Sequence, residues 1–281
     1  LRRQRQMCIR DREYGNGVHQ WYCGMQDAGG VLQKGPWVGN RFHWYCLFDN
    51  EDYRITKGVK HRFQYDSQVK NGRGYYYPGT PEYKLMATGK NMDDVKVQEP
   101  VAPFNDGLTY TNSISSNCLA FTTKYADVTD PTIGRTDAYW PFLRYADIVL
   151  IYAEAQCELN DGISQDAIDA LNDIRIRSNA KEASVTGDGA IETKVELRSV
   201  IFEERAKELA YEGDRRWDLL RWGIYLDVMN SLGGINEDGT RTPYDEGSIN
   251  KRREFRHLLY PLPSLEVSTN MAIDKNNPGW N

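Results

Sequence analysis

Hydrophobic and polar positions follow a helical period only in the second half of this 281-residue chain. After residue 142, small and apolar side chains recur every three or four positions, with charged residues between them, as on a helix with one buried face. The pattern predicts a helix that ends at Asp161 and Gly162. Its apolar face consists of Leu143, Ala146, Leu150, Ala153 and Cys157.

A second helix is predicted over residues 164–178. Because only a few residues connect it to the first, the two should pack as antiparallel neighbours. Small side chains on both helices would let their axes approach closely: Ala146, Ala153, Ala167 and Ala170.

Two further helices are predicted, over residues 193–212 and 214–230. Thr193 and Glu196 have the spacing of a capping box, in which each side chain accepts a hydrogen bond from a backbone N–H at the start of a helix. Gly213 is placed to end the first of these helices in the left-handed conformation. The second carries two apolar stripes, which predicts neighbours on both sides.

Residues 13–141 lack a sustained helical period and contain many turn signals. Short runs at 42–48 and 118–123 are typical of strands. Between residues 14 and 83, 15 of 70 side chains are aromatic. We therefore predict a loop-rich region of mixed structure that precedes the helical half.

We interpret the first twelve residues as foreign to this protein, rather than as a basic N-terminal arm. They resemble a transposon-end sequencing adaptor translated in frame, so we exclude them from the fold and expect them to make no ordered contacts. They hold five Arg and one Asp, and the remaining chain carries 30 basic against 39 acidic residues, a formal charge of −9. On this interpretation, the start of the sequence gives no information on localisation.

Composition excludes several classes of protein. The longest apolar run covers residues 148–153, too short to cross a membrane. The acidic charge argues against a nucleic-acid-binding protein. Outside the first twelve residues there are four dispersed cysteines, without the paired spacing of a zinc site. They fit buried thiols or at most a bridge or two: Cys23, Cys46, Cys118 and Cys157.

Four ordered sequence blocks resemble the SusD/RagB family. They are LRYADIVLIYAEA (143–155), ALNDIRIR (170–177), IFEERAKELAYEGDRRWDLLRWG (201–223), and YPLPSLE (260–266) followed by NPG (277–279). They cover about 140 residues. Residues 13–141 resemble the variable part of the family only loosely.

The resemblance implies a mainly α fold with degenerate tetratricopeptide-like helical pairs and a loop-rich mixed region. We divide the chain into the adaptor (1–12), the aromatic-rich region (13–141) and the helical region (142–281). Family members are lipoproteins on the outer face of the outer membrane, longer than this chain. They bind glycans or other nutrients and deliver them to a TonB-dependent transporter of the SusC type. The resemblance implies the same function, partner and location here, with no enzymatic activity.

Residues 203–212 contain four glutamates, and several arginines lie within and after this segment. Paired carboxylates can hydrolyse glycosides. Here, however, Glu204 and Glu208 lie on the same helix face as the apolar residues Leu197 and Ile201, where partly buried acids need partners. We therefore favour a structural ion-pair network, in which Glu204 and Glu208 pair with arginines at or after Arg205 across the turn at Gly213.

No catalytic or metal-binding motif stands out. Residues 49–52 are acidic but lack the spaced ligands of a calcium loop, so a solvated turn is the favoured interpretation. The four histidines are scattered, and no serine has a nucleophile-elbow pattern. We predict no metal and no cofactor.

Aromatic side chains of the loop-rich region are the candidate glycan contacts. Sugar rings present C–H faces that stack on Trp and Tyr, although such rings can also fill a core. The candidates, with neighbouring hydrogen-bonding groups, are Trp21, Tyr22, Trp37, Trp44, Tyr45, Asn40, Arg41 and Asn71. A helical scaffold that binds protein or peptide is the first alternative function, and a glycoside hydrolase is the second.

Overall fold

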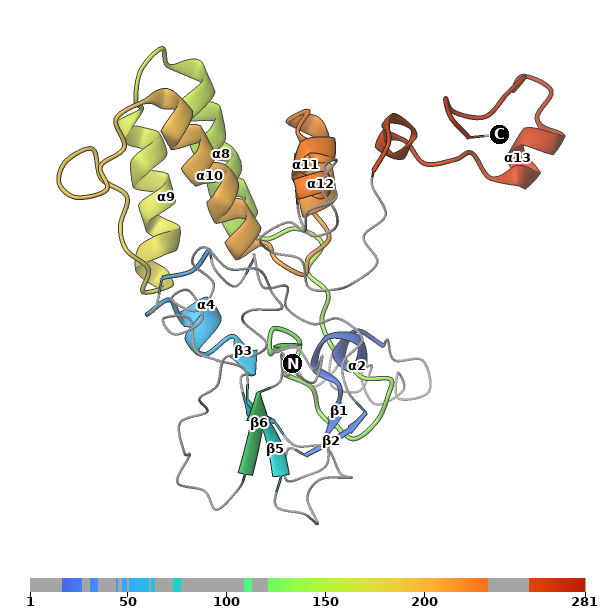
Figure 1. Cartoon of the computed structure of the whole chain (residues 1–281), viewed down its shortest axis with the longest axis horizontal. Coiled ribbons are helices and arrows are strands. Elements are labelled where there is room, and N and C mark those ends of the chain that lie inside the picture. Colours follow the sequence, from blue (N-terminus) through green and yellow to red (C-terminus); the bar gives the residue numbers. More distant parts are fainter. Residues whose placement is uncertain are drawn as a thin grey trace, which may run out of the picture. The chain divides into compact units, whose positions relative to one another are not determined.

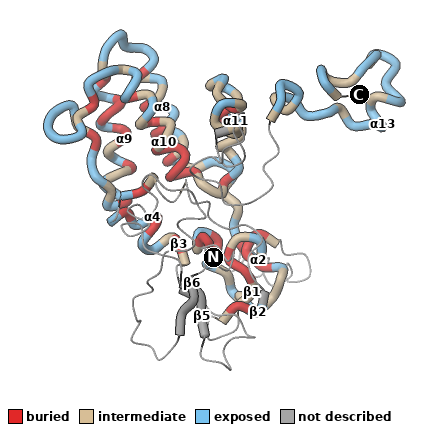
Figure 2. The backbone as a smooth tube through the Cα atoms, viewed as in Figure 1, coloured by how far each residue is buried: buried red, intermediate tan, exposed pale blue. Residues whose placement is uncertain are grey.

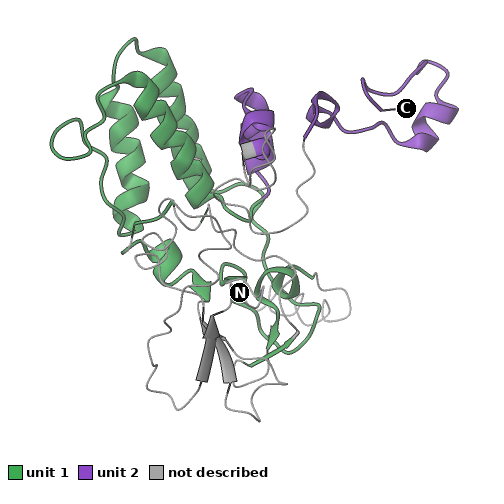
Figure 3. Cartoon of the chain, in the orientation of Figure 1, with its two compact units in different colours: residues 1–212 green, residues 213–281 purple. Residues whose placement is uncertain are grey.

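The computed structural model describes the chain in segments. These are residues 17–26, 31–34, 44, 47–49, 51–60, 62–63, 73–76, 109–112, 121–231 and 253–280, and only the backbone is described at 34, 62–63, 73–76, 109–112 and 231. The predicted adaptor, residues 1–12, lies outside the described residues. The chain divides into two compact units, Leu1–Glu212 and Gly213–Asn281 (Figure 3).

The described part of the chain is mainly helical, as predicted. Its helices in the first unit are α2 (Val18–Cys23), α4 (Tyr53–Thr56), α8 (Tyr145–Leu159), α9 (Gln165–Arg177) and α10 (Lys194–Glu208). The second unit contains α11 (Arg215–Arg221), α12 (Tyr225–Ser231), the 3-10 helix η1 (Phe255–Leu258) and α13 (Ser264–Thr269).

Short strands form small sheets in the loop-rich region (Figure 1). β1 (Met25–Gln26) pairs antiparallel with β2 (Leu32–Lys34), and β3 (Val59–Lys60) pairs antiparallel with β7 (Phe121–Thr122). β5 (Arg73–Tyr76) lies between an antiparallel β4 (Arg62–Phe63) and a parallel β6 (Thr109–Asn112). β7 confirms the strand predicted within 118–123. The strand predicted over 42–48 is wrong at the described positions, because the Leu47 N–H closes a turn by donating to the Trp44 carbonyl (3.1 Å).

Helices α8, α9 and α10 pack around an aliphatic core (Figures 1 and 2). Five residues connect α8 to α9, so these two run antiparallel as predicted. Leu150, Leu171, Leu197 and Ile201 are fully buried. The small residues expected to allow close approach are also buried: Ala146, Ala153, Ala167 and Ala170. The sequence period therefore identified this core correctly, except that Leu143 precedes α8 and is 60% exposed.

Helix starts agree with the sequence prediction. The Ser164 hydroxyl accepts a hydrogen bond from the Ala167 N–H at the start of α9. Thr193 and Glu196 form the predicted capping box of α10. Both caps satisfy backbone donors that have no partner within the helix.

Two helix ends differ from the prediction. α10 ends at Glu208 rather than at about residue 212, and the chain turns through Tyr211, which has a φ of 68°. The single helix predicted over 214–230 is two helices, because Gly223 adopts a φ of 74°. The Ile224 N–H donates to the Leu219 carbonyl (3.1 Å), which closes α11 in the manner of a Schellman motif.

Candidate functional site

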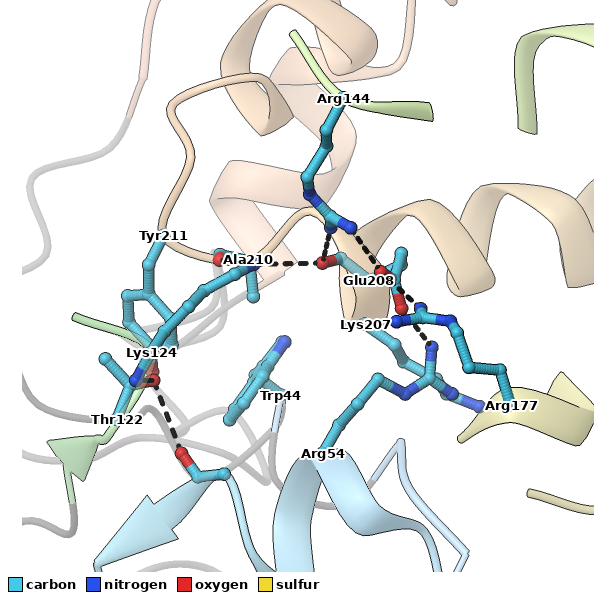
Figure 4. Close-up of a pocket in the computed structure, with 11 residues that line it drawn as sticks. Trp44, Arg54, Thr122, Lys124, Arg144, Arg177, Lys207, Glu208, Ala210 and Tyr211 are labelled. Atoms are coloured by element: carbon cyan, nitrogen blue, oxygen red, sulfur yellow. Dashed lines mark hydrogen bonds and ion pairs between the residues drawn. The ribbon is translucent and has the colours of Figure 1, made fainter. Parts of the chain in front are cut away.

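Two buried carboxylates lie one turn apart at the end of α10. Glu204 is fully buried and Glu208 is 4% exposed. Glu204 accepts from Arg54 Nη1 (2.6 Å) and Arg175 Nε (2.8 Å). Glu208 accepts from Arg144 Nη1 (2.6 Å), Arg177 Nη2 (2.7 Å) and Arg54 Nη1 (3.2 Å). These ion pairs join α4, the start of α8, the end of α9 and α10 (Figure 4).

The predicted ion-pair network therefore exists, but its predicted partners are wrong. Arg205, on the next helical position, pairs instead with Asp147 on α8 (2.8 Å). Arg216 bonds the Tyr225 hydroxyl within the second unit. Because α10 ends before the turn at Gly213, the carboxylates face α9 and α4 instead, and the nearest arginine in sequence is not their partner.

Side chains from distant segments also satisfy the last carbonyls of α10. Trp44 Nε1 donates to the Ala206 carbonyl (2.8 Å), and Arg144 Nη2 donates to the Glu208 carbonyl (2.6 Å). Lys124 Nζ donates to the Glu208 carbonyl (3.1 Å) and pairs with Glu212. Cations near a helix C-terminus complement its partial negative charge, so these contacts stabilise the helix end.

A cavity of about 220 Å³ lies beside this helix end. Trp44 and Tyr211 form its aromatic wall, and Arg54, Arg144, Arg177 and Lys207 are among its cationic lining (Figure 4). Each of these four cations is already paired with a carboxylate. The cavity is therefore lined by a neutralised network rather than by unpaired charge.

Electrostatics within the network favour ionised carboxylates. Burial alone would raise the pKa of Glu204, but the charges of Arg54 and Arg175 outweigh it and hold that pKa below its ordinary value. Arg144 and Arg177 lower the pKa of Glu208 in the same way, against its burial. Glycoside hydrolysis requires one protonated carboxylic acid with a raised pKa. Neither Glu204 nor Glu208 has a raised pKa, so the electrostatics of the pair support a structural role.

The predicted acidic turn at residues 49–52 is not simply solvated. Asp52 is 1% exposed, caps α4 by accepting from the Arg54 N–H (2.8 Å), and pairs with the Arg54 guanidinium (2.7 Å). It therefore fixes the arginine that reaches Glu204. Among the described residues, no group of three His, Cys, Asp or Glu side chains is arranged to hold a metal ion.

Three predicted glycan contacts lie within the described residues. Trp21 is 44% exposed. Tyr22 packs against Tyr125 (ring centroids 5.1 Å apart), Trp140 (5.9 Å) and Tyr211 (5.7 Å). Trp44 packs edge-on against Phe48 (4.7 Å) and bonds α10 as described. The other candidates lie outside the described residues: Trp37, Asn40, Arg41, Tyr45 and Asn71.

Tyr22 belongs to a second core, built around α2 and the segment 121–140. Tyr125 and Trp140 stack with ring centroids 5.4 Å apart, and the Tyr125 hydroxyl donates to the Tyr211 carbonyl (2.7 Å). Cys23 is a buried free thiol here, as Cys157 is in the helical core. Cys46 and Cys118 lie outside the described residues.

Similarity to known proteins extends over most of the chain. A sequence model of the SusD family matches residues 39–280. The chain belongs to the SusD family. The network around Glu204 and Glu208 thus lies in the third of the family-like blocks, and its arginines come partly from the other blocks and partly from the loop-rich region.

Individual SusD relatives match parts of the chain. SusD-like protein P2 of Formosa agariphila is 33% identical over 142 residues, which is 49% of this chain and 25% of that protein. A SusD homologue from Bacteroides thetaiotaomicron has a TM-score of 0.52 at 22% identity, over 82% of this chain and 41% of that one. A SusD superfamily protein from Parabacteroides distasonis has a TM-score of 0.55 at 18% identity, over 95% and 47%. The structures show the shared fold, and the chain spans less than half of each relative.

This SusD family chain also presents a groove between α8 and α9. A cavity of about 440 Å³ is lined on α8 by Tyr145, Ile148 and Tyr152, which are 81%, 46% and 48% exposed. The α9 wall carries three carboxylates at helical spacing: Asp166, Asp169 and Asp173. No helix among the described residues is long and apolar enough to cross a membrane.

Proposed function

We propose that this SusD family protein binds a nutrient, with a glycan as the first candidate, at the outer face of the outer membrane. It would pass the ligand to a TonB-dependent transporter of the SusC type, and a lipid anchor would hold the protein at the membrane. It would act by binding alone, without catalysis. The match of the family to residues 39–280 carries this proposal.

Geometry supports a binding role for the loop-rich region. Trp21 presents 44% of its surface to solvent, and the Gly17 backbone lies against the same indole. A large rigid ring offers contact area at small entropic cost. Tyr22 packs in the second core and Trp44 bonds the end of α10, so Trp21 is the proposed anchor among the described candidates. The sequence offers further candidates: Trp37, Tyr45, Asn40, Arg41 and Asn71.

Calorimetry against a panel of soluble polysaccharides tests this function. We expect wild-type protein to bind at least one glycan and Trp21→Ala to weaken that binding by about 2 kcal/mol. Tyr53→Ala is the matched control, because Tyr53 is also 42% exposed in the loop-rich region. A correctly folded protein that binds no glycan would refute the proposal. Co-purification with a co-expressed TonB-dependent transporter of the SusC type tests delivery.

The groove between α8 and α9 favours a second candidate function, a scaffold that binds a protein or peptide. Apolar and aromatic side chains line one wall and carboxylates line the other. That chemistry suits an amphipathic helix with a basic flank. If the scaffold function holds, such a peptide should bind, and reversal of charge by Asp169→Lys should abolish its binding without affecting glycan affinity.

A further inference from the structure

The cavity beside the end of α10 contains a buried cation with spare hydrogen-bond donors. Lys207 lines the cavity, and its side chain is 6% exposed. An ammonium group has three N–H donors. Among the described residues, that of Lys207 pairs with one carboxylate, Glu203 (2.7 Å). The Phe48 ring, whose centroid lies 6.0 Å from Nζ, adds a cation–π contact but no conventional acceptor.

Arg177 brings further donors to the same cavity. A guanidinium group has five N–H donors. Nη2 of Arg177 donates to Glu208 (2.7 Å), and the group makes no other hydrogen bond within the described part of the chain. Arg144, in contrast, donates through Nε, Nη1 and Nη2. The cations of the cavity are therefore paired in charge, but Lys207 and Arg177 are not saturated in hydrogen bonds.

Cations rather than carboxylates make up most of the charged lining of the cavity (Figure 4). The lining cations are Arg54, Lys124, Arg144, Arg177 and Lys207. Among the described residues, Glu208 is the one lining carboxylate, and three arginines already donate to it. The other carboxylates of these pairs lie outside the lining: Asp52, Glu203, Glu204 and Glu212. A cleft lined by cations attracts anions.

The size of the cavity sets the class of occupant. Its volume of about 220 Å³ is several times the roughly 30 Å³ that one water molecule takes in the liquid. A carboxylate, sulfate or phosphate group fits, together with part of the molecule that carries it. Such oxyanions accept several hydrogen bonds, and bonds from ammonium and guanidinium groups are about twice as strong as those between neutral groups.

We propose that this cavity binds a small ligand through an oxyanion group, which accepts hydrogen bonds from Lys207 Nζ and from the spare N–H groups of Arg177. The inference goes beyond the proposed function, because it concerns a different site from Trp21 and stands whether or not Trp21 contacts a glycan. A free inorganic anion and the acidic group of a sugar share this chemistry, and the experiments below separate them.

Equilibrium dialysis of the full chain against radiolabelled sulfate, in chloride buffer of constant ionic strength, tests the site. We expect one sulfate per wild-type chain. Lys207→Met keeps the apolar stem against Phe48 but removes the ammonium, so it should lower affinity about tenfold. Arg177→Gln should lower affinity severalfold. Arg198→Gln is the matched control, because Arg198 is also a partly exposed, carboxylate-paired arginine but lies outside the cavity lining. It should bind sulfate as the wild type does.

Competition identifies the source of the oxyanion. Inorganic phosphate and the sugar acid glucuronate should both displace labelled sulfate, whereas neutral glucose should not. Tighter binding of glucuronate than of phosphate would assign the site to an acidic sugar, and the reverse order would assign it to a free anion. Displacement by glucose at the concentration that suffices for glucuronate would overturn the proposal.

Two further outcomes would refute the site. If the wild type retains neither sulfate, phosphate nor glucuronate, the cavity holds only water. If folded Lys207→Met and Arg177→Gln both bind sulfate as the wild type does, the anion lies elsewhere on the surface. Far-ultraviolet circular dichroism checks the fold of each variant. Should Lys207→Met not fold, Arg177→Gln decides, because the Arg177 side chain is 58% exposed. Failure of the anion site leaves the calorimetric test of glycan binding at Trp21 untouched.

Discussion

The helical bundle of α8–α10 and the aromatic cluster around α2 form two cores of different chemistry. The bundle buries Leu, Ile and Ala side chains from one continuous stretch of chain. The cluster packs together Tyr22, Tyr125, Trp140 and Tyr211, which come from three widely separated segments of the chain. A core built from one stretch of chain can be predicted from the periodic spacing of apolar residues. A core built from distant segments shows in the sequence only as a high content of aromatic residues.

The Glu204–Glu208 network combines residues of the local helical core with residues from distant segments. Its carboxylates belong to the periodic helix α10, but Arg54 comes from the loop-rich region, 150 residues earlier. It therefore couples the local core to the segments that support the aromatic cluster. The predictions below address this coupling and then each core separately.

The largest effect is expected for Glu204→Ala. The substitution leaves the Arg54 and Arg175 guanidiniums without their buried partner, and removal of one side of a buried ion pair costs about 3–5 kcal/mol. Glu203→Ala is the control, because Glu203 is the half-exposed partner of Lys207 on the same helix and its pair contributes about 0–1 kcal/mol. Urea unfolding measures both. Equal losses for the two variants would show that the network does not couple the regions.

Acid should lower the stability of the helical bundle. Glu204 and Glu208 have folded-state pKa values below the ordinary 4.5, so their stabilisation is present above about pH 4.5 and is lost as the pH falls through the folded values. Unfolding midpoints measured across acidic pH should fall accordingly. Glu204→Gln should flatten this dependence, and an unchanged slope would contradict the network's role.

Alkali should lower the stability of the aromatic cluster around α2. Burial raises the pKa of Tyr22 and Tyr125 above 10.0, and raises the pKa of Cys23 from 9.0 to about 11 against a hydrogen bond that lowers it. The neutral forms are favoured in the folded state, so stability is full below the unfolded-state values and falls as the pH rises past them. Tyrosine absorbance at 295 nm and unfolding midpoints measure this. Tyr125→Phe should reduce the alkaline loss and leave the acid side unchanged.

The smallest effect is expected at the start of α10. Thr193→Ala removes the hydroxyl of the capping box and should cost about 1 kcal/mol. Thr186→Ala, at an exposed loop position, is the control and should change the unfolding midpoint little. A loss as large as that of Glu204→Ala would mean that the local cap, rather than the ion-pair network, limits the stability of the bundle.

By itself, the sequence determined the first two helices of the helical half and the start of the third. Apolar spacing identified the buried faces of α8 and α9, and the Thr193 and Glu196 pair identified the start of α10, because these features depend on neighbours within a few residues. The same blocks indicated the SusD family, which the match over 39–280 confirms. Residues Glu204 and Glu208 were also recognised as structural.

Tertiary structure alone decided which side chains meet. The partners of Glu204 and Glu208 lie as many as 154 residues away, and no periodic signal encodes a contact of that range. The same holds for Trp44, whose indole bonds the end of α10, and for Tyr22, whose ring lies in the aromatic cluster, while the neighbouring Trp21 stays exposed. Aromatic residues close together in sequence took opposite environments because burial depends on how distant segments pack, which local pattern does not record.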